Sequence, residues 1–325
     1  MPRALVSDRI VTVFGGSGFL GRHVIRSLAE RGWRVRNACR RPDLAQHLQP
    51  LGSVGQIVSV QANLRHGPSV RAAVEGADAV VNLVAILHES GRQTFSELHV
   101  AGARRVAEAA RAAGARQLVH ISALGADPDS ASAYARTKAQ GEAEILKAFP
   151  SSVILRPSVL FGPEDEFFNR FAALARISPV LPLIGGGRTR FQPVFAGDAG
   201  EAVAAALEGR AVPGATYELG GPEILSFREI LEYILKVTGR QRLLVPLPFA
   251  LARIQASLLQ LLPSPPLTKD QVELLKTDNV VSEEAVRSGR VLEALGIRAT
   301  ALETVVPAYL YRFRKAGQFT DIHAV

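Results

Sequence analysis

The chain has 325 residues, of which 47% are hydrophobic and 21% are charged, and this composition excludes a disordered or fibrous protein. Its length is sufficient for one large α/β domain and a smaller lobe. The formal net charge of +8 favours acidic partners or anionic lipid surfaces, but the charges are dispersed and no nucleic-acid-binding motif is recognisable, so nucleic acid is not an expected partner.

The N-terminus and the cysteine content indicate the compartment. Nine residues precede an apolar stretch at 10–14, and no run of about 18 apolar residues follows anywhere. The single cysteine, Cys39, excludes an internal disulfide and the cysteine-based metal sites, so no metal is expected. We therefore expect no targeting peptide, no membrane span, and a reducing, cytoplasmic setting of bacterial character.

The first half of the chain alternates strand-like and helix-like stretches. Strands are expected at 10–14, 34–38, 57–61, 79–83, 117–122 and 152–156, and helices most clearly at 19–31, 95–113 and 134–148. Strands separated by helices form βαβ units, whose strands lie parallel in one sheet. We predict an α/β fold with a Rossmann-like, doubly wound parallel sheet flanked by helices.

The stretch VTVFGGSGFLGRHV connects the first expected strand to the first helix. Its glycines let the backbone approach a pyrophosphate, and the helix N-terminus offers free N–H groups and positive dipole. We predict that a dinucleotide binds this turn, and the alternative is a turn that needs glycine for packing alone. The residues expected to contact the dinucleotide are Gly15, Ser17, Gly18, Phe19, Leu20 and Gly21.

The end of the second strand indicates which dinucleotide is bound. A carboxylate at this position binds the ribose of NAD, but here the chain has two adjacent arginines, Arg40 and Arg41. Guanidinium groups bind phosphate through paired hydrogen bonds, so this turn favours the 2′-phosphate of NADP(H). Two alternatives stay open: Asp43 binds the ribose, or both arginines are ordinary surface charges.

The stretch SAYARTK places Tyr134 and Lys138 four residues apart, on one face of an expected helix. The ammonium group of the lysine can lower the pKa of the phenol and make it a proton donor or acceptor. The spacing alone leaves open whether this pair catalyses a reaction or is a remnant in a protein that only holds a nucleotide.

After about residue 157 the pattern loosens, and helices are expected at 167–177, 226–238, 248–262 and 301–312. We expect a nucleotide-binding domain at 1–157 and a smaller, mixed and mainly helical lobe at 158–325 for partner or substrate contact, with residues around 190–210 returning to the first domain. Asp198 is expected to cap a helix over 199–208. The segment 248–262 is too short to span a bilayer and fits a membrane surface, a partner helix or the core of the lobe.

These features together resemble the extended short-chain dehydrogenase/reductase superfamily of NAD-dependent epimerases and dehydratases. The matching positions are the glycine turn, Asn63 and Leu64 after the third strand, Val84 and Ala85 after the fourth, the Tyr134/Lys138 pair, and Pro157 after the sixth. The resemblance implies that Lys138 holds the nicotinamide ribose, that Tyr134 exchanges a proton with substrate, and that Asn63 contacts the adenine.

One position departs from the pattern of that superfamily. Working members end the fifth strand with Ser and then Ser or Thr, and the second hydroxyl positions the substrate oxygen beside the tyrosine. Here Ser122 is followed by Ala123. Because loss of such a donor costs on the order of 100-fold in rate, we expect no catalytic residue and a vestigial Tyr134/Lys138 pair, with Ser122 or Ser132 as candidate substitutes for the hydroxyl.

The segments 245–263 and 267–282 resemble the nucleotide-binding accessory subunits of respiratory complex I, in their bacterial form. This resemblance implies a non-catalytic subunit that holds a structural NADPH, contacts other complex I subunits, and supports the peripheral arm at the cytoplasmic face of the inner membrane. The alternative is a free-standing NADP(H)-dependent oxidoreductase or sugar-nucleotide epimerase or dehydratase, in which an arginine resembling Arg190 binds substrate phosphate.

Overall fold

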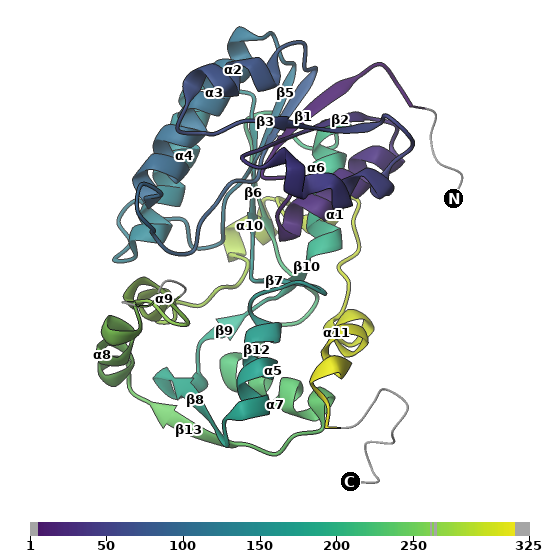
Figure 1. Cartoon of the computed structure of the whole chain (residues 1–325). Helices are drawn as coiled ribbons and strands as arrows, with labels where there is room; N and C mark the ends of the chain where they lie inside the picture. Colours follow the sequence, from purple (N-terminus) through teal and green to yellow (C-terminus); the bar gives the residue numbers. More distant parts are fainter. Residues whose placement is uncertain (1–5, 261, 263–264, 316–325) are drawn as a thin grey trace. The chain divides into compact units, whose positions relative to one another are not determined.

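The structure is a computed structural model and describes residues 6–260, 262 and 265–315 (Figure 1). Its main feature is a seven-stranded sheet in the order β11-β6-β5-β4-β1-β2-β3. The strands are β1 (Ile10–Phe14), β2 (Arg34–Cys39), β3 (Ile57–Gln61), β4 (Ala79–Asn82), β5 (Gln117–Ile121), β6 (Val153–Pro157) and β11 (Thr216–Leu219).

Every neighbouring pair in this sheet is parallel, and the direction of winding reverses between β1 and β4. A crevice opens at the carboxyl ends of the strands where such a reversal occurs. The prediction of an α/β, doubly wound parallel sheet is confirmed. β11 was not predicted, because four residues are too few to show the alternation that identifies a strand in a sequence. It is a strand because it pairs with β6, with Thr216 opposite Ile154.

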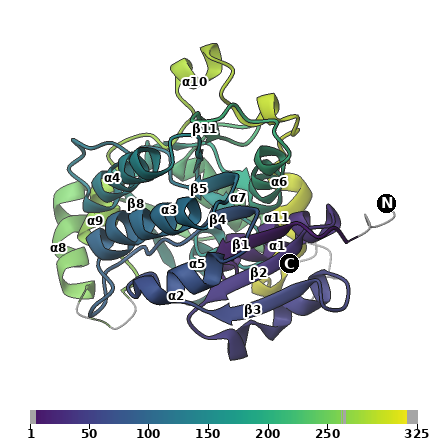
Figure 2. The same cartoon turned by 90° about the horizontal axis from the view of Figure 1, so that it is seen from above.

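Helices cover both faces of the sheet. Figure 2 shows α2 (Gly67–Val74), α3 (Gly102–Ala112) and α4 (Ala133–Ala148) along one face, and α1 (Phe19–Glu30) and α6 (Ala196–Leu207) along the other. The expected helix over 95–113 is divided, because a π-helical turn, η2 (Ser96–Ala101), precedes α3. Asp198 lies inside the first turn of α6, so its expected position ahead of the helix was wrong.

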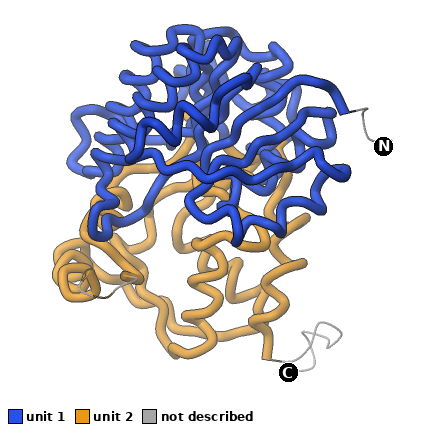
Figure 3. The backbone as a smooth tube through the Cα atoms, turned by 45° about the horizontal axis from the view of Figure 1, so that its top comes forward, with its two compact units in different colours: residues 1–157, 196–219, 282–298 blue, residues 158–195, 220–281, 299–325 orange. Residues whose placement is uncertain are grey.

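The chain divides into two compact units (Figure 3). Unit 1 comprises residues 1–157, 196–219 and 282–298, and unit 2 comprises residues 158–195, 220–281 and 299–325. The return of 282–298 to unit 1 has no signal in the sequence. That segment holds the short helix α10 (Glu283–Arg287) and a 3-10 turn, η4 (Leu292–Leu295), and Val291 forms a bridge to Glu218 of β11.

In its described part, unit 2 has three small sheets and several helices. The strand pairs are β7 (Leu160–Phe161) with β10 (Val194–Phe195), β8 (Val180–Ile184) with β13 (Leu243–Leu247), and β9 (Arg190–Phe191) with β12 (Leu225–Ser226). The helices are α5 (Phe168–Ile177), α7 (Phe227–Thr238), α8 (Phe249–Leu259), α9 (Lys269–Leu274) and α11 (Leu302–Leu310). Phenylalanines form much of the core, with Phe161, Phe168 and Phe227 fully buried.

The expected helix over 248–262 corresponds to α8, and residues 261, 263 and 264 lie outside the described part of the chain. α8 buries Ala252 and Ala256 and exposes Leu251, Ile254 and Leu258. Among the described residues, no helix has both the length and the apolar character that a membrane crossing requires.

Candidate functional site: a dinucleotide cavity at the carboxyl ends of β1 to β4

The turn between β1 and α1 has the backbone geometry of a phosphate-binding turn. Gly15 has a φ of 82°, which favours glycine, and its carbonyl accepts a hydrogen bond from the Gly18 N–H at 3.1 Å. A Cβ at Gly21 would lie 2.4 Å from the Gly16 carbonyl oxygen, so only glycine lets the helix pack this close to the turn.

The N-terminus of α1 is open to an anion. Its N-cap residue is Gly18, no side chain caps the first turn, and that turn contains no acidic residue. The N–H groups and the positive dipole of a helix start attract phosphate when no carboxylate already occupies them. The residues present therefore fit the pyrophosphate of a dinucleotide.

A cavity of about 350 Å³ lies beside this turn. It brings together most of the residues that the sequence predicts for the cofactor: Gly15, Ser17, Gly18, Phe19, Leu20, Gly21, Arg40, Asn63, Leu64, Val84 and Ala85. These residues follow β1, β2, β3 and β4, the strands on either side of the point where the winding reverses. The sequence analysis missed several further lining residues, among them Cys39, Arg65, Ile86 and Gln93.

The two arginines after β2 differ in position. Arg40 lines the cavity, and its Nη1 donates a hydrogen bond to Oε1 of Gln93. Arg41 does not line the cavity; its guanidinium is paired with the Asp43 carboxylate at 2.8 Å, and this hydrogen-bonded pair holds the pKa of Asp43 below its usual range. Arg65 is a second arginine in the lining. The cavity thus offers Arg40 and Arg65, rather than Arg40 and Arg41, to a ribose phosphate.

Asn63 retains the capacity to bind an adenine amino group. Its Oδ1 accepts a hydrogen bond from the Arg65 N–H at 3.1 Å. An amide oxygen has two lone pairs, so it can accept a second hydrogen bond from a ligand. The replacement of the usual carboxylate by an amide is therefore compatible with adenine in this part of the cavity.

Tyr134, Lys138 and Pro157 do not line the cavity. Lys138 is buried on α4, and its Nζ donates to the Ile121 carbonyl at the end of β5, at 2.7 Å. Burial lowers the pKa of Lys138 to about 8, against the opposing effect of the Glu142 carboxylate. Tyr134 is half-buried, and its ring packs edge-on against His99, with the ring centroids 5.4 Å apart.

His99, which the sequence analysis missed, connects the cavity to this helix. Its Nε2 accepts a hydrogen bond from the N–H of Ile86, a lining residue, at 3.1 Å, and its Nδ1 lies 3.1 Å from the Thr137 hydroxyl. Burial, together with the charge of Lys138, lowers the pKa of His99 to about 3, so the ring is neutral. Because Nε2 accepts, Nδ1 carries the proton and donates to Thr137, whose hydroxyl in turn donates to the Ala133 carbonyl.

His120 lies next to Ile121 on β5. It is fully buried in β5, with Nδ1 3.2 Å from the Asn82 amide nitrogen. Burial lowers the pKa of His120 below its ordinary value. Among the described residues, no three His, Cys, Asp or Glu side chains gather in a group that could hold a metal.

The hydroxyl that the family resemblance leads us to expect after Ser122 is absent. Ala123 follows β5 and carries no hydroxyl. Ser132 is the N-cap of α4, and its oxygen accepts from the Ala135 N–H at 3.2 Å. Ser122 is buried, and within the described part of the chain its Oγ has no hydrogen-bond partner. Of the two candidate substitutes, Ser132 is engaged in helix capping, and Ser122 has no partner that would orient it.

The chain has relatives along most of its length. It is 33% identical over 328 residues to the protein "NADH dehydrogenase (ubiquinone) 1 alpha subcomplex subunit 9, mitochondrial" of Arabidopsis thaliana, covering 97% of this chain and 80% of the relative. The mouse protein of the same name is 34% identical over 316 residues, covering 96% and 82%. A 2-alkyl-3-oxoalkanoate reductase of Stenotrophomonas maltophilia is 33% identical over 313 residues, covering 85% and 92%.

Solved structures share the fold. The Escherichia coli NADPH-dependent quinone oxidoreductase QOR2, complexed with NADPH, superposes with a TM-score of 0.72 at 21% identity, covering 93% of this chain and 99% of that chain. Residues 11–220 match the NAD dependent epimerase/dehydratase family. The chain therefore belongs to that family of extended short-chain dehydrogenases/reductases, and its relatives include the subunit 9 proteins named above.

Proposed function

We propose that this protein is a non-catalytic accessory subunit of respiratory complex I, which holds a structural NADPH in the cavity at the carboxyl ends of β1 to β4. The similarity to subunit 9 proteins carries the proposal, because it extends over 97% of the chain and includes unit 2 as well as the dinucleotide-binding turn. A shared turn alone would point only to a nucleotide, since many unrelated enzymes use it.

The site supports a holding role. NADPH is a hydride carrier when bound in reductases, and in this chain the α1 N-terminus would hold its pyrophosphate, Arg40 and Arg65 its 2′-phosphate, and Asn63 its adenine. The resemblance to the family implies that Lys138 would hold the nicotinamide ribose. The missing hydroxyl at Ala123 argues against turnover, because no side chain there can donate to a developing oxyanion.

We infer a peripheral location at the cytoplasmic face of a bacterial inner membrane, with other complex I subunits as partners. The net charge of +8 favours an anionic surface. α8 presents Leu251, Ile254 and Leu258 on its exposed side, at 54%, 62% and 67% exposure. This apolar stripe suits a membrane surface or a partner subunit, and it supports assembly of the chain into a larger complex.

A free-standing NADP(H)-dependent oxidoreductase or sugar-nucleotide epimerase or dehydratase is the second candidate. The observation that favours it is that α4 retains the pair of Tyr134 and a buried Lys138. In that case Tyr134 would exchange the proton, and Lys138 would orient the ribose and tune the phenol.

Native separation of gently detergent-extracted membranes tests the two candidates. For an accessory subunit, the chain migrates in stoichiometric amount with NADH:ubiquinone oxidoreductase activity. A chain recovered only as a separate soluble species would contradict the subunit proposal and make the reductase the leading candidate. The purified protein, assayed with NADPH and carbonyl substrates beside a Tyr134→Phe control, is expected to show no Tyr134-dependent turnover.

A further inference from the structure

Gln93 joins two segments of the dinucleotide cavity that lie far apart in the chain. It belongs to the loop between β4 and η2, and its side chain meets Arg40, 53 positions earlier and directly after β2. Arg40 Nη1 donates a hydrogen bond to Gln93 Oε1 at 2.5 Å, and both residues line the cavity. The arginine that the sequence predicts for a 2′-phosphate therefore has a partner from a distant loop.

The backbone of Gln93 is held by hydrogen bonds within its own loop. Ser90 and Gln93 exchange two backbone hydrogen bonds of 3.0 Å, across a turn in which Gly91 has a φ of 55°. The Phe95 N–H donates to the Glu89 carboxylate at 2.7 Å, which closes the loop on itself. Both backbone polar groups of Gln93 are thus paired, and its side chain is the part that remains to contact another segment.

The contact with Gln93 leaves the positive charge of Arg40 in place. An amide oxygen is a neutral acceptor, and this bond uses one of the five N–H donors of the guanidinium. Within the described part of the chain, no carboxylate oxygen lies within 4.0 Å of the guanidinium, and no Asp or Glu lines the cavity. The protein therefore holds Arg40 while its charge and its remaining donors stay available to an anion.

Two carboxylates close to these residues in the chain have other partners. Asp43 is paired with Arg41 at 2.8 Å, and Glu89 accepts the hydrogen bond from the Phe95 N–H. Neither carboxylate comes within 4.0 Å of the Arg40 guanidinium. The charge of Arg40 is thus left without a counter-ion because both nearby acids are engaged elsewhere.

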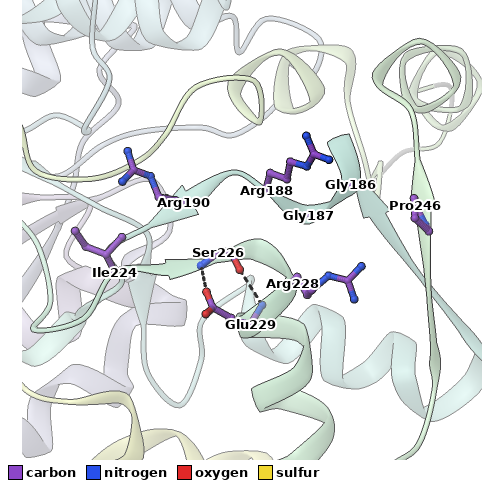
Figure 4. A pocket seen from close by; sticks show the side chains of 9 residues that line it. All are labelled: Gly186, Gly187, Arg188, Arg190, Ile224, Ser226, Arg228, Glu229 and Pro246. Atoms are coloured by element: carbon purple, nitrogen blue, oxygen red, sulfur yellow. Dashed lines mark hydrogen bonds between the residues drawn. The ribbon is translucent and has the colours of Figure 1, made fainter.

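The cavity of unit 2 shows the other arrangement. It has a volume of about 610 Å³ and is lined in part by three arginines, Arg188, Arg190 and Arg228 (Figure 4). Arg190 donates to Asp278 Oδ2 at 2.8 Å, so a carboxylate balances its charge. Arg40 and Arg190 both line a cavity, and they differ in whether the residue that holds them is neutral or negative.

We infer that Gln93 is a positioning residue for the 2′-phosphate of the nucleotide, because it holds Arg40 at the cavity without neutralising it. A guanidinium that keeps its charge forms strong paired hydrogen bonds to phosphate. The preference for NADPH over NADH then depends on a neutral acceptor at position 93 as well as on the arginine. The inference rests on the proposed function, since it concerns how the proposed NADPH site distinguishes the two nucleotides.

Two substitutions of Gln93 test the inference on the full-length protein, with NADPH and NADH each titrated by calorimetry. Q93E keeps the shape of the side chain but pairs Arg40 with a carboxylate, so it is expected to weaken NADPH binding about tenfold or more. Q93L removes the hydrogen bond without adding charge and is expected to weaken NADPH binding by about three- to tenfold. Both variants should bind NADH as the wild type does, because NADH has no 2′-phosphate.

A double variant separates positioning from a merely structural role. If Gln93 acts through Arg40, then Q93L added to R40Q weakens NADPH binding little beyond R40Q alone, because the residue that it positions is already missing. A residue that only maintains the loop would add its full effect to that of R40Q. Additive losses in the double variant would therefore contradict the inference.

The matched control is R92Q on the same loop. Arg92 is exposed, precedes Gln93 and does not line the cavity, so R92Q should bind both nucleotides as the wild type does. Circular dichroism verifies that every variant is folded. Unchanged NADPH binding in Q93E, an equal loss for NADH, or the same loss in R92Q would overturn the inference while the wild type still binds NADPH. A wild-type protein that binds neither nucleotide would contradict the proposed function itself, and the inference with it.

Discussion

At the scale of single residues, the dinucleotide cavity distinguishes between two adjacent arginines. Arg40 lines the cavity and donates a hydrogen bond to Gln93, whereas Arg41 does not line it and is paired with Asp43. The two side chains have the same chemistry and differ by one position in the chain. Their surroundings therefore determine which one can meet a 2′-phosphate.

This difference gives a paired prediction for cofactor selectivity. R40Q is expected to weaken NADPH binding by about 10- to 100-fold, because charge-assisted hydrogen bonds to the 2′-phosphate are lost, and to change NADH binding little. R41Q is expected to bind both nucleotides as the wild type does. Calorimetry gives the dissociation constants of both nucleotides for each variant. An equal effect of the two substitutions on NADPH binding would contradict the proposal that Arg40 binds the 2′-phosphate.

Two neutral buried histidines lie near Lys138 of the pair on α4. His99 and His120 both have lowered pKa values, and Lys138 has a pKa of about 8 beside them. Because burial disfavours each charged form and the Lys138 charge adds to this for the histidines, both imidazoles are neutral and the Lys138 ammonium is the positive charge beside them. Such an interior is suited to holding a ribose through hydrogen bonds, and the spacing of Tyr134 and Lys138 in the sequence does not reveal it.

At the scale of elements, the contact between α4 and the π-helical turn η2 positions these groups. Gly141 lies one turn after Lys138, and a Cβ on it would be 2.1 Å from the His99 carbonyl oxygen. The absence of a side chain at Gly141 therefore lets α4 lie directly against η2. The same contact keeps His99 within reach of Thr137 on α4.

Gly141→Ala is therefore expected to destabilise the protein, although alanine normally stabilises a helix interior. A methyl group forced into a packed contact lowers the free energy of unfolding by about 1–3 kcal/mol. Gly67→Ala is the control, because a Cβ there meets Arg71 Nη1 at an ordinary 3.5 Å. Urea unfolding followed by circular dichroism gives both values, and equal stability of the two variants would show that α4 and η2 separate without cost.

At the scale of the whole molecule, unit 1 is assembled from three separate stretches of chain. β11 extends the sheet beside β6, and α6 packs on α1 through an ion pair of 2.6 Å between Arg31 and Glu201. A ligand that binds only the folded form of this unit stabilises all three stretches at once. The proposed holding role for NADPH depends on this linkage.

NADPH is accordingly expected to raise the stability of the full-length protein by about 2.7 kcal/mol at a free concentration of 100 times its dissociation constant. Differential scanning calorimetry with increasing NADPH measures the shift. R40Q should require correspondingly more NADPH for the same shift, and Ala123→Ser should leave it unchanged. A melting temperature independent of NADPH would contradict a structural role for the nucleotide.

The sequence by itself determined six of the seven strands of the sheet and the glycine turn between β1 and α1. Their signals are local: apolar strands alternate with helices, and glycines stand where the chain leaves β1 and enters α1. The tertiary structure alone decided the parts that depend on distant segments. β11 pairs with β6, and Gln93 accepts a hydrogen bond from Arg40. His99 contacts both Ile86 and Thr137 of α4, and Arg188 and Arg228 line the same cavity. Long-range contacts leave no periodicity in the chain, so only the fold reveals them.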